Sequence, residues 1–252
     1  MSELLPTKTL AIEVLSCTDA SRERDFNWWY DKVHIPDLRE TPGIVDVYRY
    51  RDILPDFGEL GASLMAPAGK PVRYLTLYRI NSDDPWGLMQ KIKEDDKKRA
   101  AEGKMMDCME TYDLTVWDFV SYRRTVSPLQ RPETRLPDGM PEVMLLVFIS
   151  AEPARILDHD EWWLYAHAHD LLETPGLVQC HRYRSLKPKP AGDDATHLHI
   201  YEIDSDDPAA VVLKILEDDR DLRKPQGRMI SGTNRAQPYS RGVYRHWDIM
   251  CR

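Results

Sequence analysis

Several features that would assign a protein to a class are missing from this sequence. Its four cysteines, Cys17, Cys108, Cys180 and Cys251, are far apart and form no C-x-x-C pair. That spacing disfavours a cysteine-rich zinc module and is typical of reduced thiols in a cytosol. No apolar run approaches the roughly 20 residues that span a bilayer, and the N-terminus lacks the basic and apolar stretches of a secretory signal. We therefore predict a cytoplasmic protein with no membrane partner.

Positive charge is scarce as well. The 252 residues carry 34 Lys and Arg against 42 Asp and Glu, a formal net charge of -8. Nucleic acids and anionic membrane surfaces both require clustered positive charge, so neither is predicted as a partner. A nucleophile elbow, a phosphate loop and a dinucleotide fingerprint are also absent. Proton transfer on a small organic molecule remains, because it needs only a positioned base, a hydrogen-bond donor and a dry pocket.

What the chain does contain is an internal repeat. Residues 29–51 align without gaps on residues 162–184 at an offset of 133, and twelve of the 23 pairs are identical. A second block, 80–96, aligns on 203–219 at an offset of 123. Such self-similarity indicates duplicated structural units. We predict two related domains, 1–123 and 142–252, joined by a proline-containing linker at 124–141.

The apolar periodicity gives each half the same order of elements. In the first half it predicts strands at 9–15, 44–51, 72–80 and 112–122, with helices at 21–35 and from 82 to about 101. Pro36 is expected to end or kink the first helix. The fold class is therefore α+β, as tandem ferredoxin-like (β-α-β-β-α-β) domains. Each sheet would keep one bare face, and we predict that the two faces pack as an intramolecular dimeric-type α/β barrel.

One segment carries a family resemblance. The aromatic helix Trp29–Leu38, with its His34-x-Pro36, leads into the Pro42-Gly43 turn. This pattern resembles the EthD-like branch of the dimeric α/β barrel superfamily, and the resemblance covers both halves. It implies the barrel fold and supports a functional His34. The second half departs from the pattern, because His169 stands where proline is expected.

The resemblance does not select a reaction. The superfamily includes cofactor-free isomerases and lyases, oxygenases of aromatic compounds and haem enzymes, so a function must be argued from the site residues.

Two histidine–aspartate pairs are the first candidates for catalysis. His34 and His167 are equivalent, and Asp37 and Asp170 follow them by three residues, a spacing that places both side chains on one helical face. A neighbouring carboxylate would orient the imidazole and favour its charged form, as a general base near neutral pH requires. The alternative is that each pair caps a helix end.

Histidines are also unevenly distributed, with seven of the eight in the second half. His197 and His199 share one face of a predicted strand, whereas Tyr74 and Thr76 take their places in the first half. We predict that both converge with His167 on a substrate. A divalent metal bound by imidazoles is an alternative, and surface histidines are the plainer interpretation.

Other polar and aromatic side chains are candidates for substrate contact. Tyrosines would donate hydrogen bonds to a carbonyl or phenol, histidines would add polar contacts, and tryptophans would line a pocket; core packing is the alternative for each. The candidates are Tyr30, Tyr78, Tyr201, His169, His181, Trp28 and Trp163.

Together these features predict a lyase or isomerase that needs no cofactor and no metal. It would act by acid/base proton transfer on a small hydrophobic, aromatic or polyketide-like compound in a catabolic or secondary-metabolic pathway. One alternative is a haem- or metal-dependent oxidoreductase that uses second-half histidines as ligands. Another is a non-catalytic protein that binds a small molecule. The macromolecular assembly compatible with this prediction is a homodimer.

Overall fold

The structure is a computed structural model that describes residues 9–59, 73–124, 140–186, 195–230, 233–235 and 241–246. Cys251 and most of the predicted linker lie outside these residues. The chain forms two compact units, which we call unit 1 (Met1–Asp52 and Pro71–Phe119) and unit 2 (Ile53–Lys70 and Val120–Arg252). Each is described by itself.

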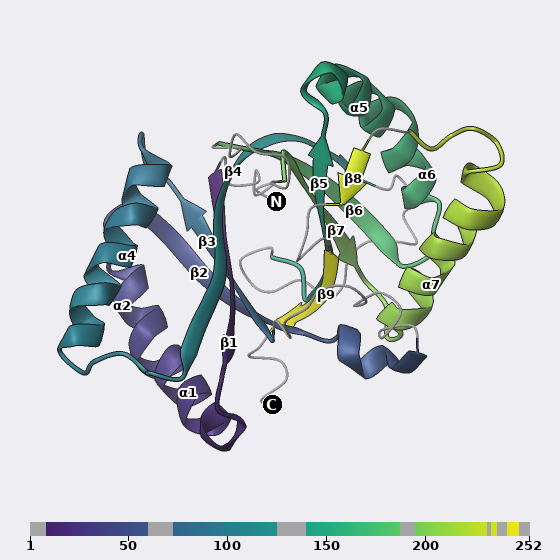
Figure 1. Ribbon diagram of the computed structural model, residues 1–252. Coiled ribbons are helices and arrows are strands. Elements are labelled where there is room, and N and C mark those ends of the chain that lie inside the picture. The colour runs from purple at the N-terminus through teal and green to yellow at the C-terminus, as the bar shows by residue number, and fades with distance from the viewer. Residues whose placement is uncertain are drawn as a thin grey trace, which may run out of the picture. The chain divides into compact units, whose positions relative to one another are not determined.

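Unit 1 is a four-stranded antiparallel sheet with helices on one face (Figure 1). The elements are β1 (Thr9–Cys17), η1 (Ala20–Arg22), α1 (Glu23–Trp29), η2 (Tyr30–His34), α2 (Ile35–Arg39), β2 (Ile44–Asp52), β3 (Tyr74–Ile80), α4 (Pro85–Ala101) and β4 (Met109–Arg124). Strand β1 pairs with β3 and β4, and β3 also pairs with β2, so the order is β4-β1-β3-β2. This is the ferredoxin-like arrangement.

Unit 2 repeats the arrangement with a divided last strand. Its elements are η3 (Leu54–Phe57), β5 (Val143–Ala151), η5 (Pro153–Arg155), α5 (Ile156–Trp162), η6 (Trp163–His167), α6 (Ala168–Leu172), β6 (Leu177–Ser185), β7 (His197–Ile203), α7 (Pro208–Asp218), η7 (Asp219–Arg223), β8 (Thr233–Arg235) and β9 (Arg241–His246). Strand β7 pairs with β6 and β5. Both β9 and β8 pair with the remaining edge of β5, one after the other.

Local sequence signals explain where the elements begin and end. Asp84 and Asp207 cap α4 and α7, because each side chain accepts a hydrogen bond from a backbone N–H three residues later. Gly43 and Gly176 have φ of 96° and 86°, a conformation that side chains disfavour, in the turns that precede β2 and β6. The predicted α+β fold of tandem ferredoxin-like units is confirmed.

The first helix of each unit contains one wide turn. Ile35 donates its backbone N–H to Tyr30 O, five residues back, and Ala168 donates to Trp163 O in the same way. Of the two outcomes expected at Pro36, an end or a kink, the end does not occur, because the helix continues to Arg39. The wide turn changes the hydrogen-bond register before the proline, so the donor that proline lacks is not missed.

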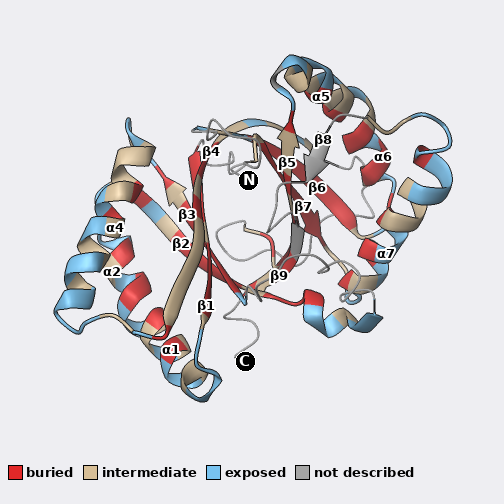
Figure 2. Cartoon of the chain, in the orientation of Figure 1, coloured by how far each residue is buried: buried red, intermediate tan, exposed pale blue. Residues whose placement is uncertain are grey.

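Burial separates the layers of each unit. Buried residues follow the strands and the helix faces turned toward the sheet, while exposed residues follow the outer helix faces (Figure 2). The core of unit 2 also contains Ile53 and Leu54, from the segment just after β2. Ile53 donates its backbone N–H to Val243 O at 2.8 Å. Unit 2 is therefore completed by residues from the first half of the sequence.

None of the helices within the described residues is long and apolar enough to cross a lipid bilayer.

Candidate functional site

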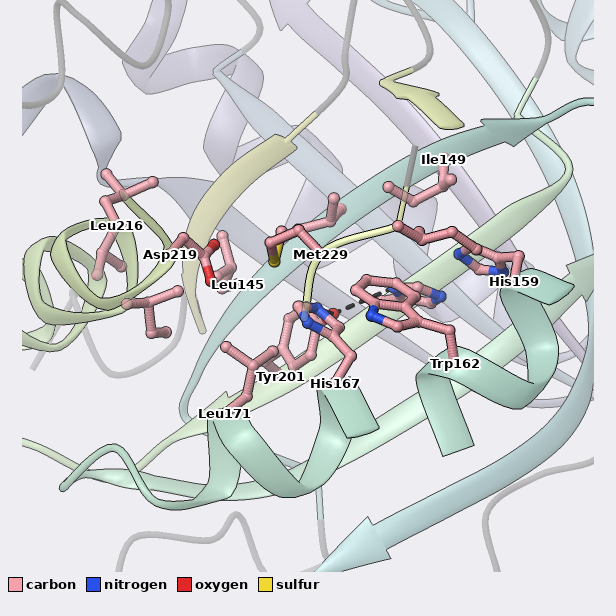
Figure 3. Close-up of a pocket in the computed structure, with 15 residues that line it drawn as sticks. Leu145, Ile149, His159, Trp162, His167, Leu171, Tyr201, Leu216, Asp219 and Met229 are labelled. Atoms are coloured by element: carbon pink, nitrogen blue, oxygen red, sulfur yellow. Dashed lines mark hydrogen bonds between the residues drawn. The ribbon is translucent and has the colours of Figure 1, made fainter. Parts of the chain in front are cut away.

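A cavity of about 250 Å³ lies in unit 2 between the helices and the sheet (Figure 3). Its walls come from β5, β7, the α5–α6 helix, α7 and the segment after η7. The lining residues are Leu145, Val147, Ile149, His159, Trp162, His167, Leu171, His199, Tyr201, Val212, Ile215, Leu216, Asp219, Met229 and Ile230. Most are aliphatic and few are polar, as in pockets for small organic molecules.

The wide helical turn builds one wall of this cavity. In an ordinary α-helix, residues five apart point about 140° away from each other. Across η6 the rings of Trp162 and His167 instead stack, with centroids 4.2 Å apart and planes 21° apart. Trp29 and His34 stack in the same way across η2, at 4.9 Å. The π turn thus places an indole and an imidazole side by side in both units.

A chain of hydrogen bonds joins the helix to the sheet within the cavity wall. The Tyr201 hydroxyl lies 3.1 Å from His199 Nδ1 and 3.4 Å from His167 Nε2, and both bonds are drawn as dashed lines in Figure 3. The outer nitrogens, His199 Nε2 and His167 Nδ1, have no hydrogen-bond partner among the described residues. The structure therefore brings His167 and His199 together through Tyr201, and their convergence with His197 on a substrate stays a prediction.

Burial favours the neutral form of the imidazoles of the site. Burial lowers the pKa of His167 to about 3, helped by the nearby positive charge of Arg223. Burial also holds the pKa of His199 well below its ordinary value. In unit 1, burial lowers the pKa of His34 to about 3 as well. The expectation that a carboxylate favours the charged imidazole was wrong, because desolvation penalises the charged form.

The two aspartates expected beside these histidines bind arginines instead. Asp37 pairs with Arg99 at 3.3 Å. Asp170 is buried and pairs with Arg228, and its backbone carbonyl accepts from Arg223 at 2.9 Å. Helical spacing put histidine and aspartate on neighbouring positions, but it could not reveal the stronger cationic partners that approach from other elements.

Asp170 instead helps to hold the segment that closes the cavity. Arg228 is tethered twice, through its side chain to Asp170 and through its carbonyl oxygen, which accepts from Trp162 Nε1 at 2.6 Å. The next two residues, Met229 and Ile230, line the cavity. The Asp170–Arg228–Trp162 contacts therefore fix one wall.

The predicted tyrosines of unit 1 are buried and lie in its core. Tyr30 shares a 2.7 Å hydrogen bond with Thr76, and Tyr78 donates to Glu13 at 2.7 Å. Burial raises the pKa of both hydroxyls. These contacts match the core-packing alternative, because each buried hydroxyl has a partner.

The remaining predicted contact residues are not among those that line the cavity. Trp28 is 63% exposed and His169 is also exposed. His181 lies on β6 and forms a 2.7 Å hydrogen bond with Glu202 of β7. In the pairing of β6 with β7 it stands opposite Ile200 rather than the cavity-lining His199. Trp163 is fully buried beneath Arg182. None of these four lines this cavity, and their contact with a substrate stays a prediction.

Three residues of this region, Trp162, His159 and Asp160, were not among the predicted site residues. Trp162 stacks on His167, and His159 lines the cavity beside His199. His197, which was predicted, is fully buried but lies behind His159, with ring centroids 4.5 Å apart. Asp160 is 3.2 Å from His197. Extending the repeat alignment by a few residues would have flagged two of them, because it places His159 on Phe26 and Asp160 on Asn27.

A haem does not fit the described cavity. Pockets for drug-sized ligands usually measure roughly 300–1,000 Å³, and haem is larger than a typical drug. The cavity measures about 250 Å³, and an iron ligand would also need an imidazole nitrogen open to a macrocycle.

Comparison with known proteins supports the fold. No family model and no curated protein matches the sequence. A solved structure of an anthrone oxidase-like protein aligns with a TM-score of 0.55 at 14% identity, over 95% of this chain and 92% of its own. A dye-decolorizing protein from V. cholerae gives a TM-score of 0.55 at 14% identity, over 98% and 97%. DypB from Rhodococcus jostii RHA1, solved in complex with heme, gives 0.57 at 9% identity, over 98% and 95%.

These similarities extend along nearly the whole chain, although their low identities carry no information about the reaction. The chain therefore shares the fold of these structures, with two ferredoxin-like units in tandem.

Proposed function

We propose that unit 2 binds a small, largely apolar organic molecule and catalyses a proton shift on it, as a lyase or isomerase. The observation that carries the proposal is the hydrogen-bonded chain His167–Tyr201–His199 in the wall of an apolar cavity. Such a cavity excludes water and strengthens the few polar contacts within it.

The chain can move a proton without creating a buried charge. A neutral imidazole has one donor and one acceptor nitrogen, and the tyrosine hydroxyl can donate and accept. If one histidine accepts a proton from the substrate, each link passes a proton on, and the other histidine returns one. This balance matters because burial lowers the pKa of His167 to about 3, which disfavours a lone imidazolium.

The lining indicates the class of substrate. Nine of the fifteen lining residues are aliphatic or methionine, and Trp162 offers an aromatic face beside His167. His159, Trp162, His167 and Tyr201 lie together, whereas Asp219 lies apart from them beside Leu216 (Figure 3). An aromatic ketone with an enolisable C–H would place its ring against the apolar wall and its reacting atoms against the chain.

Deuterium exchange tests this proposal directly. Anthrone and 2-tetralone serve as probes, since both carry an enolisable C–H, and their exchange in D₂O is followed by NMR. We expect catalysed exchange by the wild type and a loss of about 10²-fold or more in Tyr201→Phe, which breaks the chain. The matched control is Tyr78→Phe, the equivalent tyrosine of unit 1, which should exchange like the wild type.

Two results would defeat the proposal. The first is exchange of both ketones at the wild-type rate by folded Tyr201→Phe protein, and the second is the absence of catalysed exchange by the wild type. If the ketones bind, as followed by quenching of tryptophan fluorescence, but do not exchange, then the non-catalytic binding protein is the better description.

The cellular setting belongs to the same proposal. Cys17, Cys108 and Cys180 are free thiols, which supports a reducing cytoplasm. The small molecule is the proposed partner, and a homodimer stays a prediction that a sedimentation experiment can test.

A further inference from the structure

We propose that unit 2 holds a divalent transition metal through His159, Asp160 and His197, at the edge of the cavity. One ligand atom of each residue lies within 4.8 Å of the others. His197 Nε2 is 3.2 Å and His159 Nδ1 is 3.9 Å from Asp160 Oδ1. Ligand atoms around a tetrahedral zinc ion lie about 3.3 Å apart, so small side-chain rotations complete the geometry.

Buried nitrogens without hydrogen bonds point to a missing ligand. Both ring nitrogens of His159 and Nε2 of His197 have no hydrogen-bond partner among the described residues, and both rings are fully buried. The 3.2 Å approach of His197 to Asp160 is not aligned as a hydrogen bond. Unpaired buried polar atoms are costly. A metal ion would use an imidazole lone pair from each ring together with the carboxylate.

The ligands are held in place by neighbouring groups. His197 Nδ1 lies 2.9 Å from Thr196 Oγ1, which accepts from the Ala151 backbone N–H at 2.9 Å. This contact leaves Nε2 as the ligand atom and fixes the ring. A hydrogen bond to the second imidazole nitrogen is the usual companion of a metal-bound histidine.

Two arginines compete with the metal for the carboxylate. Arg182 donates to Asp160 Oδ1 at 2.8 Å, and Arg184, which is half-exposed, donates to the other oxygen. A carboxylate has about four lone-pair sites, so it can bind a metal and an arginine together. The positive charges lower the affinity for any cation. We therefore expect the site to favour the ions that bind nitrogen ligands tightly, such as Co²⁺, Ni²⁺, Cu²⁺ and Zn²⁺.

Unit 1 shows what these positions look like without metal ligands. Phe26, Asn27 and Tyr74 stand in the places of His159, Asp160 and His197. Asn27 Nδ2 donates to the Tyr74 hydroxyl at 2.9 Å, and Phe26 packs on the Tyr74 ring. The scaffold therefore accommodates a set with no imidazole, and all three positions differ together in unit 2.

The site adjoins the cavity without depending on the proposed proton transfer. His159 belongs to both, because its ring lines the cavity beside His199 at a centroid distance of 5.3 Å. Three protein ligands leave a coordination position open, as in catalytic metal sites. A bound metal would add a Lewis acid next to the substrate.

Metal binding can be measured without a substrate. Wild-type protein, treated with chelator and then dialysed, is titrated with Co²⁺ by visible absorption and with Zn²⁺ by calorimetry. We expect one equivalent to bind, with d–d bands from nitrogen and oxygen ligands and a rise in melting temperature. Metal content of the untreated protein then identifies the resident ion.

The variants use the residues of unit 1. His159→Phe, Asp160→Asn and His197→Tyr should each weaken Co²⁺ affinity by at least about tenfold. His169→Ala, which removes an exposed histidine, should bind like the wild type. Wild-type protein that binds neither ion, or folded variants that bind like the wild type, would overturn the proposal. If one variant does not fold, the other two decide. Loss of metal binding with ketone exchange intact would separate this site from the proposed function.

Discussion

Units 1 and 2 share a helix with a π turn, a stacked Trp–His pair and a tyrosine on a central strand, but they differ in what surrounds that tyrosine, which in unit 2 lines the cavity described above. Thr76 pairs with Glu13 across β1 and β3, and His199 pairs with Val147 across β5 and β7. In unit 1 the Glu13 carboxylate accepts from Tyr78 and from Thr111. In unit 2 the equivalent valine lines the cavity.

This difference shows how a duplicated scaffold can diverge. In unit 1, Arg49 lies over the rings of Phe26, Tyr30 and Tyr74, at 5.1, 4.5 and 4.2 Å from their centroids. Such contacts make a packed polar–aromatic core. In unit 2, histidines replace two of these partners, and an imidazole adds titratable and ligating nitrogens in nearly the same space. A few substitutions on a shared backbone therefore replace core packing residues with side chains that can bind protons or metals.

The largest expected effect on stability comes from truncating Trp163, a buried tryptophan of unit 2. Trp163 is fully buried, and Trp163→Ala should lower the free energy of unfolding by about 3–5 kcal/mol, because it opens a cavity in the core. Trp28 is 63% exposed, and Trp28→Ala should change it by less than about 0.5 kcal/mol. Chemical denaturation measures both. Similar costs would contradict the difference in burial between Trp163 in unit 2 and Trp28 in unit 1.

The buried histidines should make stability depend on pH. Burial lowers the pKa of His34 from 6.5 to about 3, so the unfolded chain binds a proton more readily than the folded protein between these pH values. The contribution of neutral His34 to the free energy of unfolding is therefore fully present above pH 6.5. It is lost as the pH falls toward about 3, at up to about 1.4 kcal/mol per pH unit. Urea midpoints of His34→Gln should fall less steeply with acid than those of the wild type, and parallel curves would contradict this assignment.

The equivalent aspartates should differ in their contribution. Asp170 is buried with Arg228, whereas Asp37 is about half-exposed with Arg99. Asp170→Asn should cost about 1–3 kcal/mol of unfolding free energy, and Asp37→Asn less than about 1 kcal/mol. Asp170→Asn should also loosen the Met229–Ile230 wall, seen as faster amide hydrogen exchange there. Equal stabilities and equal exchange would refute the tethering role.

The smallest effect concerns the π turn. Proline inside a helix usually costs about 3 kcal/mol, but unit 1 carries Pro36 just after its π turn. Unit 2 has the same turn before His169. His169→Pro should therefore cost less than about 1 kcal/mol by thermal denaturation. A loss near 3 kcal/mol would show that the two turns are not equivalent.

The fold could be predicted from the sequence because its signals are local and repeated. Strand alternation, the Asp-Pro helix starts and the Pro-Gly turns each depend on a few neighbouring residues. The continuation of the helix beyond Pro36 could not be predicted, because no motif in the sequence marks the π turn that precedes it. The π turn also hid the five-residue spacing of Trp162 and His167, which an α-helix would place on different faces.

The site was predicted only in part. The two-residue period of a strand was enough to predict that His197 and His199 lie on the same face of the sheet. The partners of Asp37 and Asp170 could not be predicted, because Arg99 and Arg228 approach from distant segments. His159 and Asp160 needed the repeat alignment to extend beyond its identical pairs, and the depressed pKa of His167 depends on burial that no spacing reveals.

The segment Ile53–Phe57 has a consequence for how the protein is made. Ile53 and Leu54 belong to the core of unit 2, and Ile53 bonds Val243, so about 190 residues are synthesised between them. At about 5–20 residues per second, these apolar side chains wait roughly 10–40 s for the strand that covers them. During that interval Ile53 and Leu54 lack part of their packing, so unit 2 can be completed only after residue 243 has been synthesised.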